Sequence, residues 1–218
     1  MRKHLEEYNK HVEWMFSDLK GLKGLPTFKN TSWNSLDQIF ELPFNWVIKG
    51  LSGNGQFTEN NGKKIIEILK NKLDTKVIVE IGTTSVYEGS STQAFVVNKN
   101  NDTKFYSIDI AAGDPGVDHA KYKNITFLRS KSVDQLVKDV LNEQLIDILF
   151  IDGDHSLKVV FEEYAFYLPM MKKNGVIILH DTTMHPGPFL FMEAINENIF
   201  KKEILFEEDY GLGIIYLQ

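Results

Sequence analysis

Short apolar segments that alternate with stretches of helical periodicity constrain the fold of this chain more than any other feature. We expect strands near 77–81, 104–108, 125–129, 146–151 and 175–179, and helices near 90–99, 132–142, 156–168 and 188–198. Alternation of this kind gives a parallel sheet with helices on both faces. The sequence therefore predicts an α/β protein.

The last part of the chain breaks this alternation. Residues 203–207 and 213–217 are both apolar in pattern, and only a short turn with Asp209 and Gly211 separates them. Such a turn is too short for the crossover that joins parallel strands. We expect an antiparallel hairpin at the edge of the sheet.

The first part of the chain also differs from the rest. Apolar residues recur at three- and four-residue intervals from Leu5 to Leu19, which predicts an amphipathic helix. Residues 25–57 are rich in aromatics but broken by prolines and glycines, which favours irregular structure that covers a sheet edge or roofs a site. We expect an N-terminal helical and irregular extension over 1–57 and the main domain over 58–218. The extension is a candidate contact in a homo-oligomer.

Composition excludes several classes of function. The 218 residues carry a net charge of -6 and show no dense basic stripe, which argues against a nucleic-acid partner. The absence of cysteine excludes disulfides, a thiolate nucleophile and cysteine-ligated metals. We find neither a secretory signal pattern nor an apolar run of membrane length, so we expect no membrane partner and a cytoplasmic location.

Acidic residues follow two of the predicted strands. The apolar run 148–151 leads into Asp152, Asp154 and His155, and Asp181 ends the next strand. Ligands bind outside the carboxyl ends of strands in open α/β sheets. Because adjacent strands lie about 5 Å apart, these two strand ends can share a hard cation such as magnesium, calcium or manganese.

A second group of residues has features of a nucleotide-binding site. Glu80 and Gly82 lie at the end of the first strand, Gly89 and Ser91 precede a helix, and Asp109 ends the second strand. Glycine lets the backbone approach a ligand, a helix amino terminus offers N–H groups, and a carboxylate after the second strand can accept ribose hydroxyls. The glycine spacing departs from GxGxxG, and glycine turns also occur in α/β proteins that bind no nucleotide.

In order and spacing, these segments resemble the class I S-adenosylmethionine-dependent methyltransferases over roughly residues 60–218. The Asp-Gly-Asp-His motif at 152–155 and the segment 174–182 are similar to metal-dependent small-molecule and sugar O-methyltransferases, of the methyltransferase 24-like kind and related to catechol O-methyltransferase. The resemblance implies a Rossmann-like seven-stranded sheet, mostly parallel, with an antiparallel terminal strand.

The resemblance also implies roles for individual residues on the cofactor side. Glu80 would hold the amino-acid part of S-adenosylmethionine, and Asp109 would bind the ribose. Ser132 would lie at the adenine. The full cofactor-binding set that the resemblance implies is Glu80, Gly82, Gly89, Ser91, Asp109, Ser132 and Asp152.

On the metal side, Asp152 and Asp181 match two ligands of a divalent cation, with Mg²⁺ as the expected ion. The family's third ligand is Asn or Asp directly after the second acid, and here that position is Thr182. Thr182, His180, a water or Asp154 would complete the shell. In the family the metal orients vicinal hydroxyls and lowers the pKa of the one that attacks the methyl group.

Methyl transfer to a hydroxyl also needs a base, and the catalytic candidates are Asp154, which we prefer, and His155. We therefore expect an O-methyltransferase for a small, polyhydroxylated acceptor such as a sugar or a natural-product intermediate. One alternative is a non-heme iron hydroxylase, with a two-His, one-carboxylate site drawn from His155, His180 and His185. The other is a catalytically silent methyltransferase-like binding subunit, which the weak ligand Thr182 keeps open.

Overall fold

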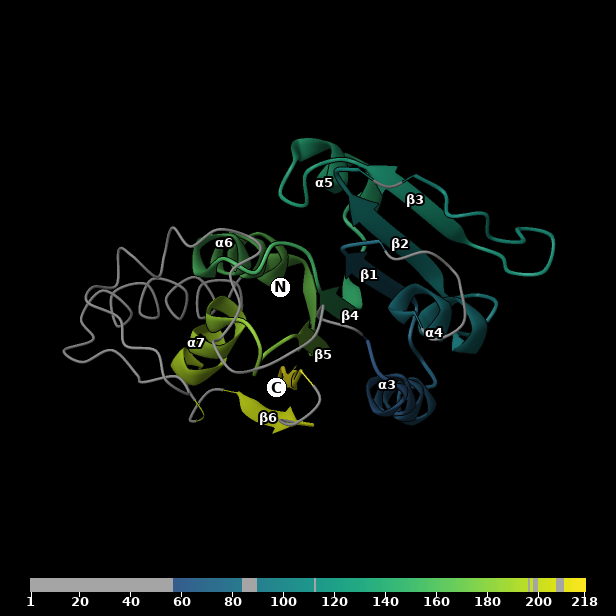
Figure 1. Ribbon diagram of the computed structural model, residues 1–218. Coiled ribbons are helices and arrows are strands. Elements are labelled where there is room, and N and C mark those ends of the chain that lie inside the picture. The colour runs from purple at the N-terminus through teal and green to yellow at the C-terminus, as the bar shows by residue number, and fades with distance from the viewer. Residues whose placement is uncertain (1–56, 84–89, 112, 196, 198–199, 207–209) are drawn as a thin grey trace.

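The computed structural model describes residues 57–83, 90–111, 113–195, 197, 200–206 and 210–218. In this part of the chain a seven-stranded sheet lies between two layers of helices (Figure 1). The predicted helix at 5–19 and the aromatic stretch before residue 57 lie outside the described residues. The boundary of the extension stays a prediction.

The sheet confirms the predicted strands and their mostly parallel arrangement. Its strands are β1 (Val77–Ile81), β2 (Lys104–Asp109), β3 (Ile125–Arg129), β4 (Ile146–Ile151), β5 (Met171–His180), β6 (Lys201–Leu205) and β7 (Leu212–Tyr216). They lie in the order β3-β2-β1-β4-β5-β7-β6. The first five strands pair in parallel, and β7 is antiparallel to both β5 and β6. The terminal hairpin is therefore the antiparallel edge that the sequence predicts.

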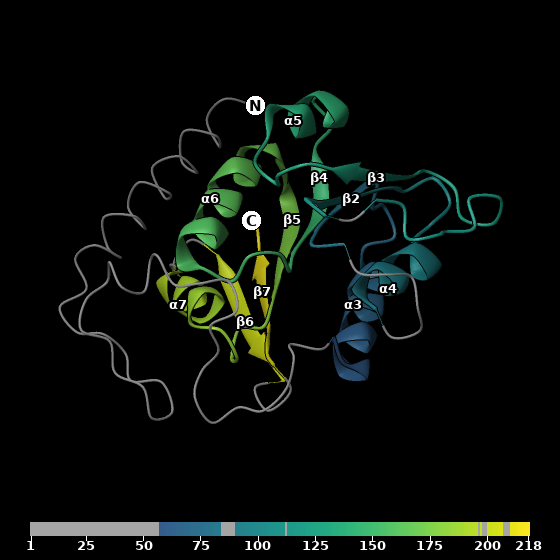
Figure 2. The ribbon, with the colours of Figure 1, turned by 45° about the horizontal axis from the view of Figure 1, so that its top comes forward.

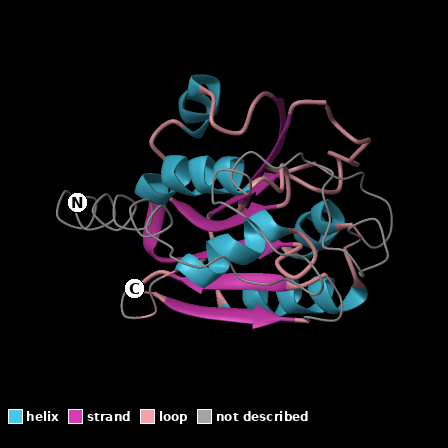
Figure 3. Ribbon diagram, turned by 60° about the vertical axis from the view of Figure 1, so that its left-hand side comes forward, coloured by secondary structure: helices cyan, strands magenta, loops and turns pink. Residues whose placement is uncertain are grey.

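Helices cover both faces of this sheet (Figure 2). They are α3 (Glu59–Asn71), α4 (Ser91–Asn98), α5 (Gln135–Leu141), α6 (Leu157–Tyr167) with the short 3-10 turn η1 (Leu168–Met170), and α7 (Pro186–Ala194). One buried core joins the sheet to α5, α6 and α7, and a second joins its other face to α3 and α4. Figure 3 shows the same layers by element type.

The two cores explain the continuous apolar runs in the sequence. Successive side chains of a strand point to opposite faces, and here both faces are covered. In β1, Val79 packs in the core with α5 to α7, whereas Ile78 packs in the core with α3 and α4. All of β1 and β4 is buried. These strands therefore lack the alternation of apolar and polar residues that is typical of a strand with one exposed face.

Polar caps fix where three helices begin. The side chains of Ser90, Asp134 and Ser156 accept hydrogen bonds from the backbone N–H groups of the first turns of α4, α5 and α6, at 3.0, 2.9 and 3.4 Å. Such caps satisfy N–H groups that have no partner within the helix. The predicted helix at 132–142 consequently starts later, after its cap.

Two predicted boundaries are corrected by the structure. Helix α7 spans 186–194 instead of 188–198, because proline fits the first turn of a helix, where no N–H donor is needed. Strand β5 starts at Met171 instead of 175, and its pairing with β4 shifts register between Ile146 and Ile148. Within the described ranges, no helix is long and apolar enough to cross a membrane.

Candidate functional site

The carboxyl ends of the parallel strands gather the predicted site residues at one edge of the sheet. Gly82 follows β1, Asp109 ends β2, Asp152 follows β4 and Asp181 follows β5. β1 lies between β2 and β4, so the chain leaves it in one direction and later returns on its other side. Such a switch point opens a crevice at the strand ends.

Glu80 lies beneath this edge as a fully buried carboxylate. Its oxygens accept hydrogen bonds from the hydroxyls of Ser91 and Thr92 at 2.8 Å and from Ser107 at 2.6 Å. Burial raises the pKa of Glu80 to about 7, although the three hydrogen bonds oppose the shift. Glu80 therefore ties β1 to β2 and to the first turn of α4. Direct contacts of Glu80 and Ser91 with a cofactor stay predictions.

Gly82 makes the turn after β1 possible. Its φ of +86° lies in the left-handed region, and a Cβ at this position would clash with the carbonyl oxygen of Asp152. Asp109 accepts hydrogen bonds from the backbone N–H groups of Thr83 at 3.1 Å and Ala111 at 2.6 Å. Asp109 thus holds Thr83, which leaves β1, next to Ala111, which leaves β2. Gly89 lies outside the described residues.

Ser132 lies next to an acid that sequence reasoning missed. The Ser132 hydroxyl donates to Oε1 of Glu163 at 2.6 Å, and the Tyr167 hydroxyl donates to the carbonyl oxygen of Ser132 at 2.5 Å. Burial raises the pKa of Glu163 to about 8, and the nearby charge of Asp154 adds to the shift. Its position could have been noticed in the sequence, because Glu163 falls on the apolar face of α6, where Val160, Tyr164 and Tyr167 are also buried.

Asp152 and Asp181 share a buried network with His180. Nδ1 of His180 lies 3.2 Å from Oδ1 of Asp152 and 3.3 Å from Oδ1 of Asp181. Its Nε2 lies 2.8 Å from the side-chain amide of Asn61 on α3. Asn61 was also missed, because a polar residue 119 positions away in the chain gives no sign of this contact. His180 therefore orients both acids.

The two acids respond to this network in opposite directions. Burial raises the pKa of Asp181, and the like charge of Asp152 adds to the shift. Burial also opposes ionisation of Asp152, but the charge of His180 and the imidazole of His155, whose Nε2 lies 3.6 Å from Oδ1, more than offset it and lower its pKa. Two nearby carboxylates titrate as a pair, so the first to ionise disfavours the second.

Two further histidines lie on the other side of Asp181. Nε2 of His155 is 3.3 Å from Oδ2 of Asp181, and Nε2 of His185 is 3.8 Å from the same oxygen. The two imidazole rings stack, with centroids 4.1 Å apart. His155, Asp181 and His185 form one group with the spacing of metal ligands, and Asp152, His180 and Asp181 form another.

The backbone of Asp181 has an unusual conformation. Its φ is +57°, in the left-handed region that side chains rarely adopt, although Asp is among the residues enriched there. Its side chain is 1% exposed. Such conformations persist where the surroundings hold them, and they cluster at ligand sites.

The remaining predicted residues lie around this centre. Asp154 is half-buried and accepts a hydrogen bond from the backbone N–H of Ser156 at 2.8 Å. The Thr182 side chain packs against Gly211 and Gly213 beside the terminal hairpin. Its hydroxyl is buried and has no hydrogen-bond partner among the described residues. A role for Thr182 as a metal ligand stays a prediction.

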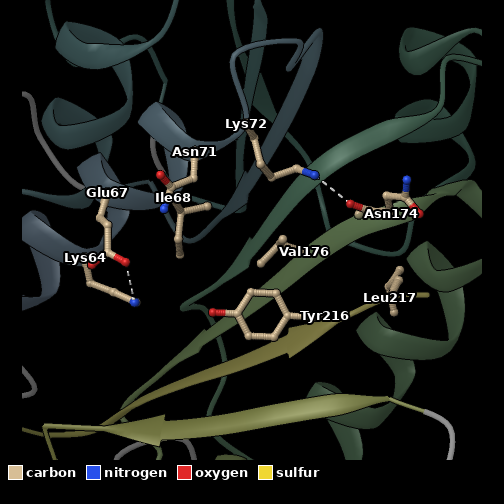
Figure 4. A pocket seen from close by; sticks show the side chains of 10 residues that line it. Lys64, Glu67, Ile68, Asn71, Lys72, Asn174, Val176, Tyr216 and Leu217 are labelled. Carbon is tan, nitrogen blue, oxygen red and sulfur yellow. Dashed lines mark hydrogen bonds and ion pairs between the residues drawn. The ribbon is translucent and has the colours of Figure 1, made fainter.

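A pocket of about 180 Å³ lies between α3 and the strands β5 and β7 (Figure 4). Lys64 pairs with Glu67 at its rim, and the Lys72 ammonium donates to the carbonyl oxygen of Asn174 at 2.6 Å. Val176 lines the pocket five residues before Asp181 along β5. At about 3.3 Å per residue, the pocket is roughly 16 Å away from the acid and histidine cluster.

Comparison with known proteins points to one kind of domain. Residues 79–182 match the family model described as "Methyltransferase domain". An uncharacterized protein, R132, of Acanthamoeba polyphaga mimivirus is 29% identical over 145 residues, which cover 61% of this chain and 64% of that protein. The residues that match the family model, 79–182, run from β1 to just past β5 and include both Asp152 and Asp181.

Two solved structures match parts of this chain. MycE methyltransferase from the mycinamycin biosynthetic pathway, in complex with Mg, SAH and mycinamycin VI, has a TM-score of 0.52 at 12% identity. The match covers 72% of this chain and 49% of MycE, so the chain spans about half the length of that protein. A methyltransferase from Geobacter sulfurreducens has a TM-score of 0.47 at 14% identity, with 73% of this chain and 79% of that one covered.

Proposed function

Because residues 79–182 match a family model described as a methyltransferase domain, we propose that the chain is a class I methyltransferase that transfers a methyl group from S-adenosylmethionine to a hydroxyl. The acceptor is a small, polyhydroxylated molecule such as a sugar or a natural-product intermediate. The observation that carries the proposal is the edge of the sheet itself. The matched segment brings Gly82, Asp109, Asp152 and Asp181 to the carboxyl ends of neighbouring strands.

The cofactor fits the part of this edge formed by β1 and β2. The left-handed Gly82 leaves no side chain between the loop after β1 and the backbone of Asp152. Asp109 holds its carboxylate at the end of β2, where an acid can accept ribose hydroxyls. Ser91, Ser132 and the undescribed Gly89 complete the proposed cofactor site. Asp152 contributes negative charge that favours the sulfonium cation.

A divalent cation fits the part formed by β4 and β5. The carboxylates of Asp152 and Asp181, in one group with His180, repel each other when both are ionised, and a cation relieves that repulsion. Asp152 and Asp181 would hold it, with Thr182 as the third proposed ligand. A bound cation of this kind would lower the pKa of an acceptor hydroxyl and orient its neighbour. MycE holds Mg and SAH together, which supports Mg²⁺ as a candidate on this fold.

Asp154 is the proposed base, ahead of His155. The hydroxyl proton passes to the base while the oxygen attacks the methyl carbon, and the carbon–sulfur bond breaks to leave neutral S-adenosylhomocysteine. Asp154 lies two residues beyond Asp152 in the loop that enters α6, held by the N–H of Ser156. His155 is instead stacked on His185 and faces Asp181.

Turnover with methyl-labelled S-adenosylmethionine tests the proposal. The full chain is incubated with sugars, glycosylated natural products and catechols, and label in the acceptor is followed together with S-adenosylhomocysteine. We expect transfer to at least one vicinal diol, and a large loss of rate in Asp154→Asn. Binding of S-adenosylhomocysteine without transfer to any acceptor would favour the silent binding subunit instead.

An iron-dependent hydroxylase is the second candidate function, because His155, His185 and Asp181 provide two imidazoles and one carboxylate. That ligand set suits non-heme iron. It leaves no role for Gly82 and Asp109, and the methyltransferase match favours the first proposal. Turnover that needs iron and oxoglutarate and is undiminished in Asp109→Ala would reverse this order.

The partners that we propose follow from the net charge of the chain and from the site at the edge of the sheet. We propose small molecules and no nucleic acid, since the net charge is -6. We also propose a cytoplasmic location without a membrane partner, and a homo-oligomer contact through residues 1–57.

A further inference from the structure

Three imidazoles surround the carboxylate of Asp181, and two of them converge on one of its oxygens. His155 and His185 place Nε2 atoms 3.3 and 3.8 Å from Oδ2. The rings come from the loop before α6 and the cap of α7, and they stack at an interplanar angle of 16°. The two elements hold them together, since α6 and α7 pack through Tyr164 and Phe191, whose ring centroids are 4.8 Å apart.

These distances are long for hydrogen bonds but suit ligands of one ion. Charge-assisted N–H···O bonds measure about 2.7–2.9 Å. Two ligand atoms that each lie about 2.1 Å from an ion at a tetrahedral angle are about 3.4 Å apart. The separations of Oδ2 of Asp181 from the two Nε2 atoms, 3.3 and 3.8 Å, lie near that value.

His180 differs from the other two histidines. Its Nε2 meets the Asn61 amide at 2.8 Å, and its Nδ1 meets Asp152 at 3.2 Å. Both ring nitrogens thus already face protein groups. His180 acts as an outer partner that orients the acids, as hydrogen-bonded groups around metal sites commonly do.

We propose that His155, Asp181 and His185 form a binding site for a first-row transition metal such as Zn²⁺, Co²⁺ or Fe²⁺, in preference to Mg²⁺. Imidazole suits these ions, whereas Mg²⁺ takes oxygen ligands. The inference revises one part of the proposed function, because it keeps only Asp181 of the proposed ligands Asp152, Asp181 and Thr182. It rests on that function in one respect, that this cation is the one beside the acceptor. It also assigns His155 as a ligand, which leaves the proton to Asp154.

Metal binding to the full chain tests the site without any methyl transfer. Protein stripped with a chelator is titrated with Zn²⁺, Co²⁺ and Mg²⁺ by calorimetry, and the visible absorption of bound Co²⁺ reports its ligands. We expect one tight Zn²⁺ site per chain, at least about 100-fold tighter than Mg²⁺, with Co²⁺ bands that indicate nitrogen ligation.

Variants separate this site from other histidines. His155→Gln and His185→Gln should each weaken Zn²⁺ binding by about 10- to 100-fold or more. The control is His119→Gln, because His119 is half-exposed and pairs with Asp114. It should leave Zn²⁺ binding unchanged. Circular dichroism spectra like that of the native chain show that all three variants fold.

Tighter binding of Mg²⁺ than Zn²⁺, or Zn²⁺ binding that is unchanged in both site variants, would overturn the inference. Binding of S-adenosylhomocysteine tests the proposed function separately from the metal site. If the native chain fails to bind S-adenosylhomocysteine but keeps the histidine-dependent Zn²⁺ site, the proposed function fails and the metal site stands.

Discussion

Replacement of Glu80 by glutamine should remove a specific part of the pH dependence of stability. Glu80 is fully buried, and burial raises its pKa from 4.5 to about 7. The fold therefore favours the protonated carboxyl. Its contribution is fully present below pH 4.5 and is lost as the pH rises through 7. Glutamine is neutral at every pH and keeps the shape of the side chain.

The size of the effect follows from the two pKa values. Across most of the range from pH 5 to pH 8, Glu80 is ionised in the unfolded chain but protonated in the folded one, so unfolding releases a proton. Linkage then lowers the free energy of unfolding by about 2–3 kcal/mol over this range. This loss is absent in Glu80→Gln, so the free energy of unfolding of the variant rises by about 2–3 kcal/mol relative to that of the native chain between pH 5 and pH 8.

Urea unfolding of the native chain and Glu80→Gln at pH 5 and pH 8 measures this difference. Glutamine also changes the hydrogen bonds with Ser91, Thr92 and Ser107, but that offset is the same at both pH values. Glu163 is present in both proteins, so its own titration cancels. The control is Glu162→Gln, an exposed acid on α6. A difference that stays within about 0.5 kcal/mol across the range would refute the account of Glu80.

Three further changes test other parts of the structure. Gly82→Ala should lower the free energy of unfolding by about 2 kcal/mol or more and abolish binding of S-adenosylhomocysteine, because φ is +86° and the added Cβ meets the Asp152 carbonyl; normal binding would contradict this. Asp147→Ala removes the acceptor for the backbone N–H groups of Lys76 and Val77 at the other end of the sheet. It should cost about 2–4 kcal/mol in urea unfolding and leave the Kd for S-adenosylhomocysteine unchanged. Asn61→Ala removes the partner of His180 and should cost about 1–3 kcal/mol. It should also weaken metal binding by about tenfold or more, and unaltered metal affinity in calorimetry would exclude its positioning role.

The sheet was predictable because burial on both faces leaves a strong signal. β4 is buried at all six positions, and its sequence is apolar except for Asp147. The carboxyl ends of parallel strands lie at one edge whatever the detailed packing, which is why Asp152 and Asp181 could be placed near each other from the sequence. Helix boundaries shifted by a few residues where a cap or a proline decided the first turn.

The partners of the site residues were harder to predict, because they depend on register and helix packing. Glu80 meets Ser107 because β1 and β2 pair them directly across the sheet. His185 meets His155 only because α7 packs on α6. Asn61 reaches His180 from a helix that precedes the first strand. Each contact joins residues far apart in the chain, and no local pattern encodes it.

Calorimetric titration of the full chain with S-adenosylhomocysteine tests the central claim most directly. We expect one site per chain with a Kd in the micromolar range, about −8 kcal/mol. Asp109→Ala should weaken binding at least tenfold, because it removes the carboxylate at the end of β2. The control Asp114→Ala, which alters an exposed loop acid paired with His119, should bind as the native chain does. Absence of binding by the native chain at millimolar ligand would contradict the assignment of this edge as a cofactor site.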